Sequence, residues 1–308
     1  MTDAPILRFT AQLKAEGWTD QRIARAVRDG ELVRVVRNVY RWPGELTPQQ
    51  AHLARARGVL SRMGSSVVLS HDSAALAHGL PVATADPAVV HLTTPPPARV
   101  RVRSGYHVHV APLEADDVTE VNGVRVTSLA RTACDLARTA DFPWAVAAAD
   151  RVLRLGVRRA ELFAVADAAP GAVGTRALRE VAAFADGRAG SIAESVSRVT
   201  MRRAGIPAPE LQVEVIGPEG WVATSDFGWR DRGVVGEMDG EAKYRDRLER
   251  LKQSPEKVFG AERVRDDGIR RADWWPCHWG WKLAWDVRAL GAKLREAFVH
   301  ADAFRGRP

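Results

Sequence analysis

The spacing of hydrophobic and polar positions changes several times along the chain, and each spacing predicts a kind of element. Near the N-terminus, apolar residues at helical intervals predict helices at 5–16 and 19–28. Alternation then predicts a β-hairpin at 32–42. Two helices followed by a short basic hairpin are the arrangement of a winged helix, so residues 1–45 are expected to form a winged-helix domain.

The middle of the chain mixes helical and alternating patterns. The predicted elements are helices at 48–63 and 70–82, strands at 89–93, 100–102 and 106–110, and a hairpin leading into a helix at 121–138. Alanine-rich helices follow as far as Phe184, and the segment DGRAGS at 186–191 is the best candidate boundary. We therefore expect an α/β and helical middle domain over residues 46–187.

The last third has longer strands and further helices. The predicted elements are a helix from residue 191, a hairpin with strands at 221–229 and 234–239, a charged helix within 244–271, a strand at 274–281 and a closing helix at 285–304. Residues 188–308 are thus expected to form a C-terminal α/β domain. The chain as a whole is predicted to be an α+β protein.

Composition narrows the class of protein. A length of 308 residues predicts two or three domains, and the 46% apolar content is enough for real cores. The formal charge of +7 comes mostly from arginine, which binds phosphate well and favours nucleic acid as a partner. The alternative is that the arginine content reflects only a GC-rich genome.

Cysteine usage and the N-terminus indicate the compartment. Cys134 and Cys277 lie far apart, which excludes a disulfide framework and a Cys-x-x-Cys metal site. The N-terminus lacks the basic start and apolar run of a signal peptide, and no apolar stretch approaches about 18 residues. We expect a cytoplasmic protein with no membrane partner and no small-molecule cofactor.

Arginines are concentrated on two predicted surfaces. Those of the N-terminal helix and hairpin are Arg22, Arg25, Arg28, Arg34 and Arg37, and those of the C-terminal charged helix are Arg263 and Arg270. Spaced along one face, such residues are expected to contact the DNA backbone. The alternative is a solvated face without a partner.

Three acids come together if the C-terminal hairpin forms. Pairing across the turn brings Asp226 close to Glu237, and Asp239 projects from the same face as Glu237. Carboxylates this close repel one another unless a cation lies between them, and Mg²⁺ or Mn²⁺ prefers such oxygen ligands. The sequence therefore predicts a metal site at these three residues, with Lys243 close behind. A surface hairpin with scattered acids is the alternative.

The same residues resemble a known nuclease fold. Asp226 and the segment EMDGEAK at 237–243 resemble the PD-(D/E)XK nucleases, and among them the branch similar to very-short-patch-repair endonucleases. The resemblance covers about residues 188–300 and implies a restriction-endonuclease-like α/β domain with a mixed sheet. The catalytic residues that it implies are Glu194, Asp226, Glu237 and Lys243. In the simplest family pattern the lysine comes two residues after the glutamate, where this chain has Asp239.

The N-terminal segment resembles a second family. GWTDQRIARAVRDGELVRVVRNVYRWP, at 17–43, is similar to the winged helix of AbiEi-like antitoxins, which belong to toxin–antitoxin systems of the abortive-infection type. Asn38 stands where that family often has glycine, and asparagine also adopts the left-handed turn conformation. The resemblance implies DNA binding, with a cognate toxin or a second copy of the chain as a further partner.

Two pairs of histidines are spaced as metal ligands often are. His71 and His78 lie seven residues apart on one predicted helix, and His107 and His109 alternate onto one strand face. Packing between helices explains the first pair, and no third ligand lies within reach of the second pair by sequence. We expect packing or surface roles for all four.

These observations favour a DNA-binding protein with a metal-dependent endonuclease domain that hydrolyses phosphodiester bonds, in phage defence or a toxin–antitoxin system. One alternative is a non-catalytic, antitoxin-like transcriptional repressor whose nuclease-fold domain is a scaffold, which the displaced lysine favours. Another is a nuclease that cleaves RNA, since the same site cleaves either backbone.

Overall fold

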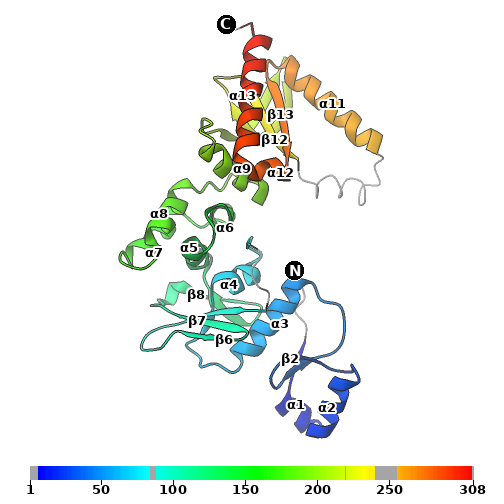
Figure 1. Ribbon diagram of the computed structural model, residues 1–308, viewed down its shortest axis with the longest axis vertical. Helices are drawn as coiled ribbons and strands as arrows, with labels where there is room; N and C mark the ends of the chain where they lie inside the picture. Colours follow the sequence, from blue (N-terminus) through cyan, green and yellow to red (C-terminus); the bar gives the residue numbers. More distant parts are fainter. Residues whose placement is uncertain (1–5, 84–87, 219, 240–254, 307–308) are drawn as a thin grey trace. The chain divides into compact units, whose positions relative to one another are not determined.

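A computed structural model describes residues 6–83, 88–218, 220–239 and 255–306 (Figure 1). The chain divides into two compact units. The first contains Met1–Ala148 and Gly156–Ala183, and the second contains Ala149–Leu155 and Phe184–Pro308. Each unit combines helices with a sheet that has both parallel and antiparallel neighbours, so the predicted α+β class with a mixed sheet is confirmed.

The first unit begins with two helices and a small antiparallel sheet. Its elements are β1 (Leu7–Phe9), α1 (Thr10–Ala15), α2 (Asp20–Arg28), β2 (Val33–Val36) and β3 (Val39–Arg41), with the strands in the order β1-β3-β2. Leu13, Ile23 and Tyr40 are buried together as its core. The predicted hairpin is confirmed, and Asn38 in its turn has a left-handed backbone with a φ of 67°.

The prediction of one helix over residues 5–16 is wrong in its first half. Leu7–Phe9 form a strand that pairs antiparallel with β3. The other edge of β3 already pairs with β2, and β1 provides hydrogen-bonding partners for the edge that is left. The helical spacing does describe α1, where Leu13 is fully buried. A long-range strand pairing therefore overrode a local helical pattern.

A six-stranded mixed sheet follows, in the order β6-β7-β5-β4-β9-β8. Its strands are β4 (Val68–Leu69), β5 (Val90–Thr94), β6 (Arg101–Arg103), β7 (Tyr106–Val110), β8 (Val118–Val121) and β9 (Val124–Thr127). The helices along this part of the chain are α3 (Pro48–Leu60), α4 (His71–His78), η1 (Ala115–Asp117), α5 (Leu129–Thr139), α6 (Phe142–Arg154), α7 (Arg159–Asp167) and α8 (Thr175–Phe184). Strands β5 and β7 are parallel neighbours, which brings residues 91 and 107 into register.

A buried arginine ties α5 to the segment before β8. Arg131 is only 5% exposed. Its Nε donates to Oδ1 of Asp135 at 3.0 Å, and its Nη1 donates to Oδ2 of Asp117 at 2.8 Å and to the carbonyl of Pro112 at 2.9 Å. Because Asp135 is itself 3% exposed, its charge depends for compensation on Arg131 and on Arg138, whose Nη1 lies 3.7 Å from Oδ1.

The second unit has a four-stranded sheet in the order β10-β11-β12-β13. Its elements are α9 (Ile192–Arg203), β10 (Glu210–Gly217), β11 (Gly220–Trp229), β12 (Val234–Asp239), α11 (Pro255–Arg271), β13 (Trp275–Gly280), α12 (Trp281–Trp285) and α13 (Val287–Phe304). The first three strands are antiparallel, and β13 runs parallel to β12. Figure 1 shows the strands between α13 and α11. The main core lies on the side of α9 and α13, and a smaller one lies beneath α11.

Gly236 lies in β12 against a buried indole. A Cβ there would lie 2.6 Å from Cη2 of Trp279 and 3.3 Å from Cβ of Phe227. The two aromatic rings stack in the core and have little room to move. We predict that Gly236→Ala destabilises the protein by about 1–3 kcal/mol, because the extra methyl group overpacks this core.

Chemical denaturation followed by tryptophan fluorescence measures this effect. Gly280→Ala is the matched control, because a Cβ at Gly280 meets nothing within 4 Å and the backbone φ is −95°. It should change the free energy of unfolding by less than about 0.5 kcal/mol. Equal losses in the two variants would contradict the packing argument.

Candidate functional site

The alternation of side chains along β11 breaks at Asp226. Phe227 packs in the core on the side of α9 and α13, whereas Ala223 packs with Ile269 of α11. Regular alternation would place both on one face of the sheet. The neighbouring strand β10 is irregular at the same level, where Gln212 has a φ of 54°. The sheet is therefore distorted at the position of the first predicted acid.

This distortion places Asp226 beside Glu237. Asp226 comes just before Phe227, and Glu237 comes just after Gly236, which is the backbone partner of Phe227. Oδ2 of Asp226 accepts a hydrogen bond from the amide of Met238 at 2.9 Å, and Oε1 of Glu237 accepts one from Oγ of Ser225 at 3.0 Å. The structure thus brings together two of the predicted site residues.

Glu237 is a buried carboxylate that is held by a cation. It is 8% exposed, and Nη2 of Arg265 on α11 lies 2.6 Å from its Oε1. Burial raises the pKa of Glu237, and the charge of Asp226 raises it further, whereas Arg265, His278 and the hydroxyl of Ser225 lower it. Since a buried carboxylate is costly without compensation, this position requires positive charge.

A second group of acids surrounds His278, next to the ends of β12 and β13. Nε2 of His278 lies 3.0 Å from Oδ1 of Asp266, and Nδ1 lies 3.5 Å from Oδ1 of Asp239 and 4.0 Å from Oε1 of Glu262. The neighbouring carboxylates of Asp239 and Asp266 raise the pKa of His278 to about 10. The imidazole is therefore protonated at neutral pH.

The predicted metal ligands fall into two neighbouring groups. Asp226 and Glu237 form one, whereas Asp239 gathers with Glu262 and His278, whose ligand atoms all lie within 4.8 Å of one another. Sequence reasoning missed Arg265 and His278. His278 comes into register with Glu237 only through the parallel pairing of β12 with β13, which has no local sequence signal.

Glu194 lies in the first turn of α9, which Ser191 caps. Its side chain accepts hydrogen bonds from the amide of Gly190 at 2.6 Å, the hydroxyl of Ser191 at 2.9 Å and Nε2 of Gln212 at 3.2 Å. Gln212 lies at the level of Asp226 on the neighbouring strand. Glu194 is thereby joined to the distorted part of the sheet through one amide side chain. Lys243, the fourth predicted catalytic residue, lies outside the described residues.

The predicted arginines of α2 are exposed. The guanidinium of Arg22 lies over the ring of Trp18, 4.1 Å from its centroid. Nε of Arg25 lies 3.3 Å from Asp29, and Nε of Arg28 lies 4.0 Å from the same carboxylate. Ion pairs this exposed contribute little to stability and exchange readily for other partners.

The remaining predicted arginines lie in the hairpin and on α11. Arg34 is exposed on β2, with its guanidinium 5.8 Å from the ring centroid of Tyr40, and Arg37 is exposed in the turn before β3. Arg263 is exposed on α11, while Arg270 pairs with Asp267 at 3.3 Å. All these positions are accessible or partly accessible to a large ligand.

Four histidines cluster on the six-stranded sheet, which the spacing of His107 and His109 alone did not indicate. His91 of β5 lies in register with His107, and its Nδ1 is 3.1 Å from Nε2 of His109. The ring of His71 stacks on that of His109, with centroids 3.8 Å apart. Burial, with contributions from neighbouring histidines, lowers the pKa of His91 to about 4 and the pKa values of His71 and His109 to about 3. A third imidazole, that of His91, therefore joins His107 and His109 through the pairing of β5 with β7, which the sequence alone did not indicate.

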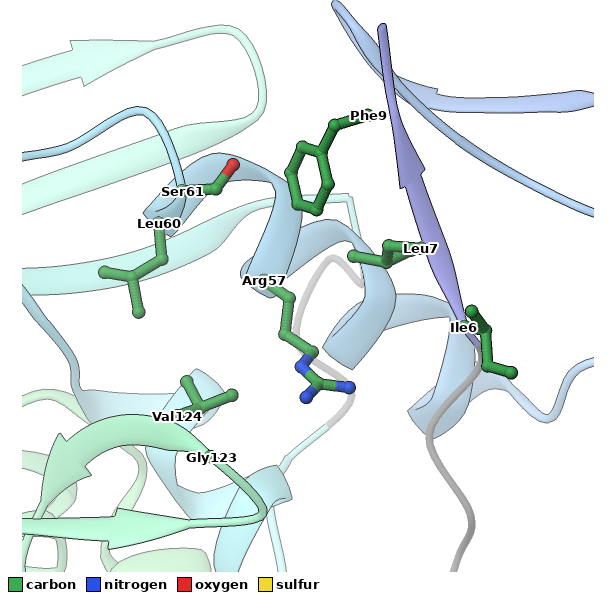
Figure 2. A pocket seen from close by; sticks show the side chains of 8 residues that line it. All are labelled: Ile6, Leu7, Phe9, Arg57, Leu60, Ser61, Gly123 and Val124. Atoms are coloured by element: carbon green, nitrogen blue, oxygen red, sulfur yellow. The ribbon is translucent and has the colours of Figure 1, made fainter. Parts of the chain in front are cut away.

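A cavity of about 490 Å³ lies in the first unit (Figure 2). Figure 2 shows Ile6, Leu7 and Phe9 of the N-terminal segment lining it opposite Arg57 and Leu60 of α3. The other lining residues are Ser61, Gly123 and Val124. None of the eight is an acid or a histidine, and the polar side chains among them are those of Arg57 and Ser61.

No helix in the described parts of the chain combines the length and the apolar character that crossing a membrane requires.

Comparison with known proteins gives relatives of unknown function. No family model matches the chain. It is 32% identical over 223 residues to the uncharacterized proteins MT2308 and Rv2248 of Mycobacterium tuberculosis, which covers 72% of this chain and 78% of each relative. It is also similar to the crystal structure of the RV2827C protein of Mycobacterium tuberculosis, with a TM-score of 0.42 and 18% identity over 63% of this chain and 75% of that one.

Proposed function

The chain belongs to the family of the uncharacterized mycobacterial protein Rv2248, and we propose that it is a DNA-binding, metal-dependent endonuclease. One observation carries the proposal: Asp226 and the buried Glu237 lie side by side where the sheet is distorted, at a position that requires positive charge. By the family resemblances of its two ends, the protein would act in phage defence or a toxin–antitoxin system. A cognate toxin or a second copy of the chain is a further proposed partner.

The donor set fits Mg²⁺ or Mn²⁺. Asp226 and Glu237 offer the hard carboxylate oxygens that these ions prefer, and Asp239 offers a further carboxylate beside His278. Asp226 and Glu237 would hold the ion, with Asp239 as the third proposed ligand. When bound, the ion would polarise the phosphate and lower the pKa of an attacking water.

The chain's own cations support the same chemistry. Arg265 already donates to the carbonyl of Thr224 at 3.0 Å besides pairing with Glu237. A cation at Glu237 would leave this guanidinium available for a phosphate oxygen, which it matches in geometry. His278 holds a proton at neutral pH and fixes the carboxylates of Asp239 and Asp266. Glu194 and Gln212 would position the distorted strands.

The arginines of α2 are proposed to contact the DNA backbone. Replacing Arg22 and Arg25 together by alanine is expected to weaken DNA binding across sequences. It should also reduce the slope of log affinity against log salt concentration by about one for each lost phosphate contact. Fluorescence anisotropy with a labelled duplex over a range of salt concentrations measures the slope. Arg158→Ala, another exposed arginine that pairs with Glu161 at 2.9 Å, is the control. An unchanged slope in the double variant would make these arginines a solvated face.

Two observations favour a second candidate, a non-catalytic antitoxin-like repressor. Nη2 of Arg265 lies 2.6 Å from Oε1 of Glu237 and compensates its charge, and the carboxylate of Glu194 accepts hydrogen bonds from the amide of Gly190 and the hydroxyl of Ser191. In this alternative the C-terminal domain is a scaffold for a partner.

Incubation of the purified protein with plasmid DNA and Mg²⁺ or Mn²⁺, beside a chelator control, decides between the two. A structured RNA tested in parallel identifies an RNA-cleaving nuclease. Cleavage that depends on the metal supports the endonuclease, and DNA binding with no cleavage of either substrate supports the repressor.

A further inference from the structure

Three imidazoles of the first unit converge on one point. His91 comes from β5, and His107 and His109 come from the parallel neighbour β7. Residues two apart on a strand project from the same face, and His91 lies in register with His107, so all three share a face of the sheet. One ring nitrogen of each lies within 4.8 Å of the others.

These separations approach those of a metal site. A tetrahedral zinc ion with Zn–N bonds of about 2.0–2.1 Å holds its ligand nitrogens about 3.3 Å apart. Nδ1 of His91 and Nε2 of His109 are already 3.1 Å apart. Small rotations of the rings would bring the third nitrogen into place, since His107 and His109 have their ring centroids 4.2 Å apart.

Two buried oxygens at the cluster have no hydrogen-bond partner among the residues that the structure describes. One is Oδ2 of Asp135, a residue that is 3% exposed and whose charge acts on His109. The other is Oγ1 of Thr93, which lies in register with His109 on the neighbouring strand. Carboxylates beside metal-bound histidines usually accept the proton of the second ring nitrogen. These oxygens therefore suit the surroundings of a histidine-bound metal.

His71, the first residue of α4, packs against the cluster through its ring. Its φ is 49°, a left-handed backbone that is unfavourable for a residue with a side chain and that recurs at functional sites. Ser70 occupies the predicted N-cap position of α4, but its hydroxyl lies 2.9 Å from Nδ1 of His71 and makes no hydrogen bond to a backbone amide of the helix. The His71 ring stacks face to face on His109, so it packs against the cluster and does not point a nitrogen at its centre.

We propose that His91, His107 and His109 bind a divalent transition metal of the zinc class, with a fourth position open to water or another small ligand. Imidazole nitrogens suit Zn²⁺, Cu²⁺, Ni²⁺ or Co²⁺ better than Mg²⁺, so this site is chemically distinct from the carboxylates of the second unit. The inference is independent of the proposed nuclease activity. A three-histidine site with an open position can serve catalysis or hold a ligand.

The site is tested by dialysing the full chain against a chelator and then titrating it with Zn²⁺ or Co²⁺. Zn²⁺ binding is measured by calorimetry, and Co²⁺ binding by visible absorption, which distinguishes four-coordinate from six-coordinate metal. We expect one Zn²⁺ to bind in the first unit and Co²⁺ to give a four-coordinate spectrum. His109→Ala should weaken Zn²⁺ binding at least about 100-fold.

His278→Ala and His300→Ala are the matched controls. His278 belongs to the acidic group of the second unit, and His300 is exposed on α13, so both variants should keep this Zn²⁺ site. Circular dichroism of the metal-free variants confirms that they are folded, and His107→Ala replaces His109→Ala if the latter is not. Failure of the wild type to bind Zn²⁺ would overturn the proposal. So would Zn²⁺ binding that is lost in His278→Ala but unchanged in His91→Ala, His107→Ala and His109→Ala.

Discussion

Asp226→Ala is expected to reduce metal-dependent cleavage at least about 100-fold while leaving DNA binding intact, because it removes one of two carboxylates proposed to hold the ion. The side chain also accepts a hydrogen bond from the amide of Met238. Loss of that one bond should cost about 1–3 kcal/mol, less than the total stability of a typical domain, so the domain should stay folded. Glu237→Gln keeps the shape of the site and removes its charge, and we expect a similar loss of activity.

The cleavage rate is measured with plasmid DNA at saturating Mg²⁺ or Mn²⁺. DNA binding is measured separately by fluorescence anisotropy. Glu214→Ala is the matched control, since Glu214 is an exposed carboxylate of the neighbouring strand β10. It should cleave as the wild type does. Full activity in both Asp226→Ala and Glu237→Gln would place any nuclease site elsewhere in the chain.

Arg131→Ala is expected to destabilise the first unit by about 3–5 kcal/mol, the typical cost of removing one partner of a buried ion pair. Asp135 is 3% exposed, and its carboxylate accepts a hydrogen bond from Nε of Arg131, whereas Nη1 of Arg138 lies farther away, 3.7 Å from Oδ1. Without Arg131, the carboxylate would be left in a low-dielectric interior where burial already raises its pKa. Asp117 and the carbonyl of Pro112 would lose their contacts as well.

Thermal and urea denaturation of the wild type and variant measure this loss. Arg179→Ala is the control, because Arg179 pairs with Asp167 at 2.6 Å but the two side chains are 50% and 62% exposed. Exposed pairs contribute less than about 1 kcal/mol, so the two variants should differ widely. A loss in Arg131→Ala no larger than the control's would mean that water or a rearranged neighbour compensates Asp135.

The sequence by itself determined several elements and part of the site, because these depend on contacts between residues close together in the chain. Thr19 begins α2 by accepting a hydrogen bond from the amide of Arg22, and Asn38 turns the first hairpin. The second hairpin could be predicted because its strands are joined by a short turn, which fixes their register. That register puts Asp226 at the level of Glu237, so their proximity was foreseeable from residues eleven positions apart, whereas the distortion of the sheet at Asp226 was not.

Only the tertiary structure decided the contacts made between distant segments. β1 became a strand because β3 had an edge to pair, and His91 joined His107 and His109 because β5 and β7 are parallel neighbours. Parallel pairing also brought His278 to the acids of β12, and α11 brought Arg265 to Glu237. Hydrophobic periodicity reports which face of a segment is buried, but it does not report which other segment covers that face. The neighbours that set charge and metal-binding capacity are therefore fixed by packing.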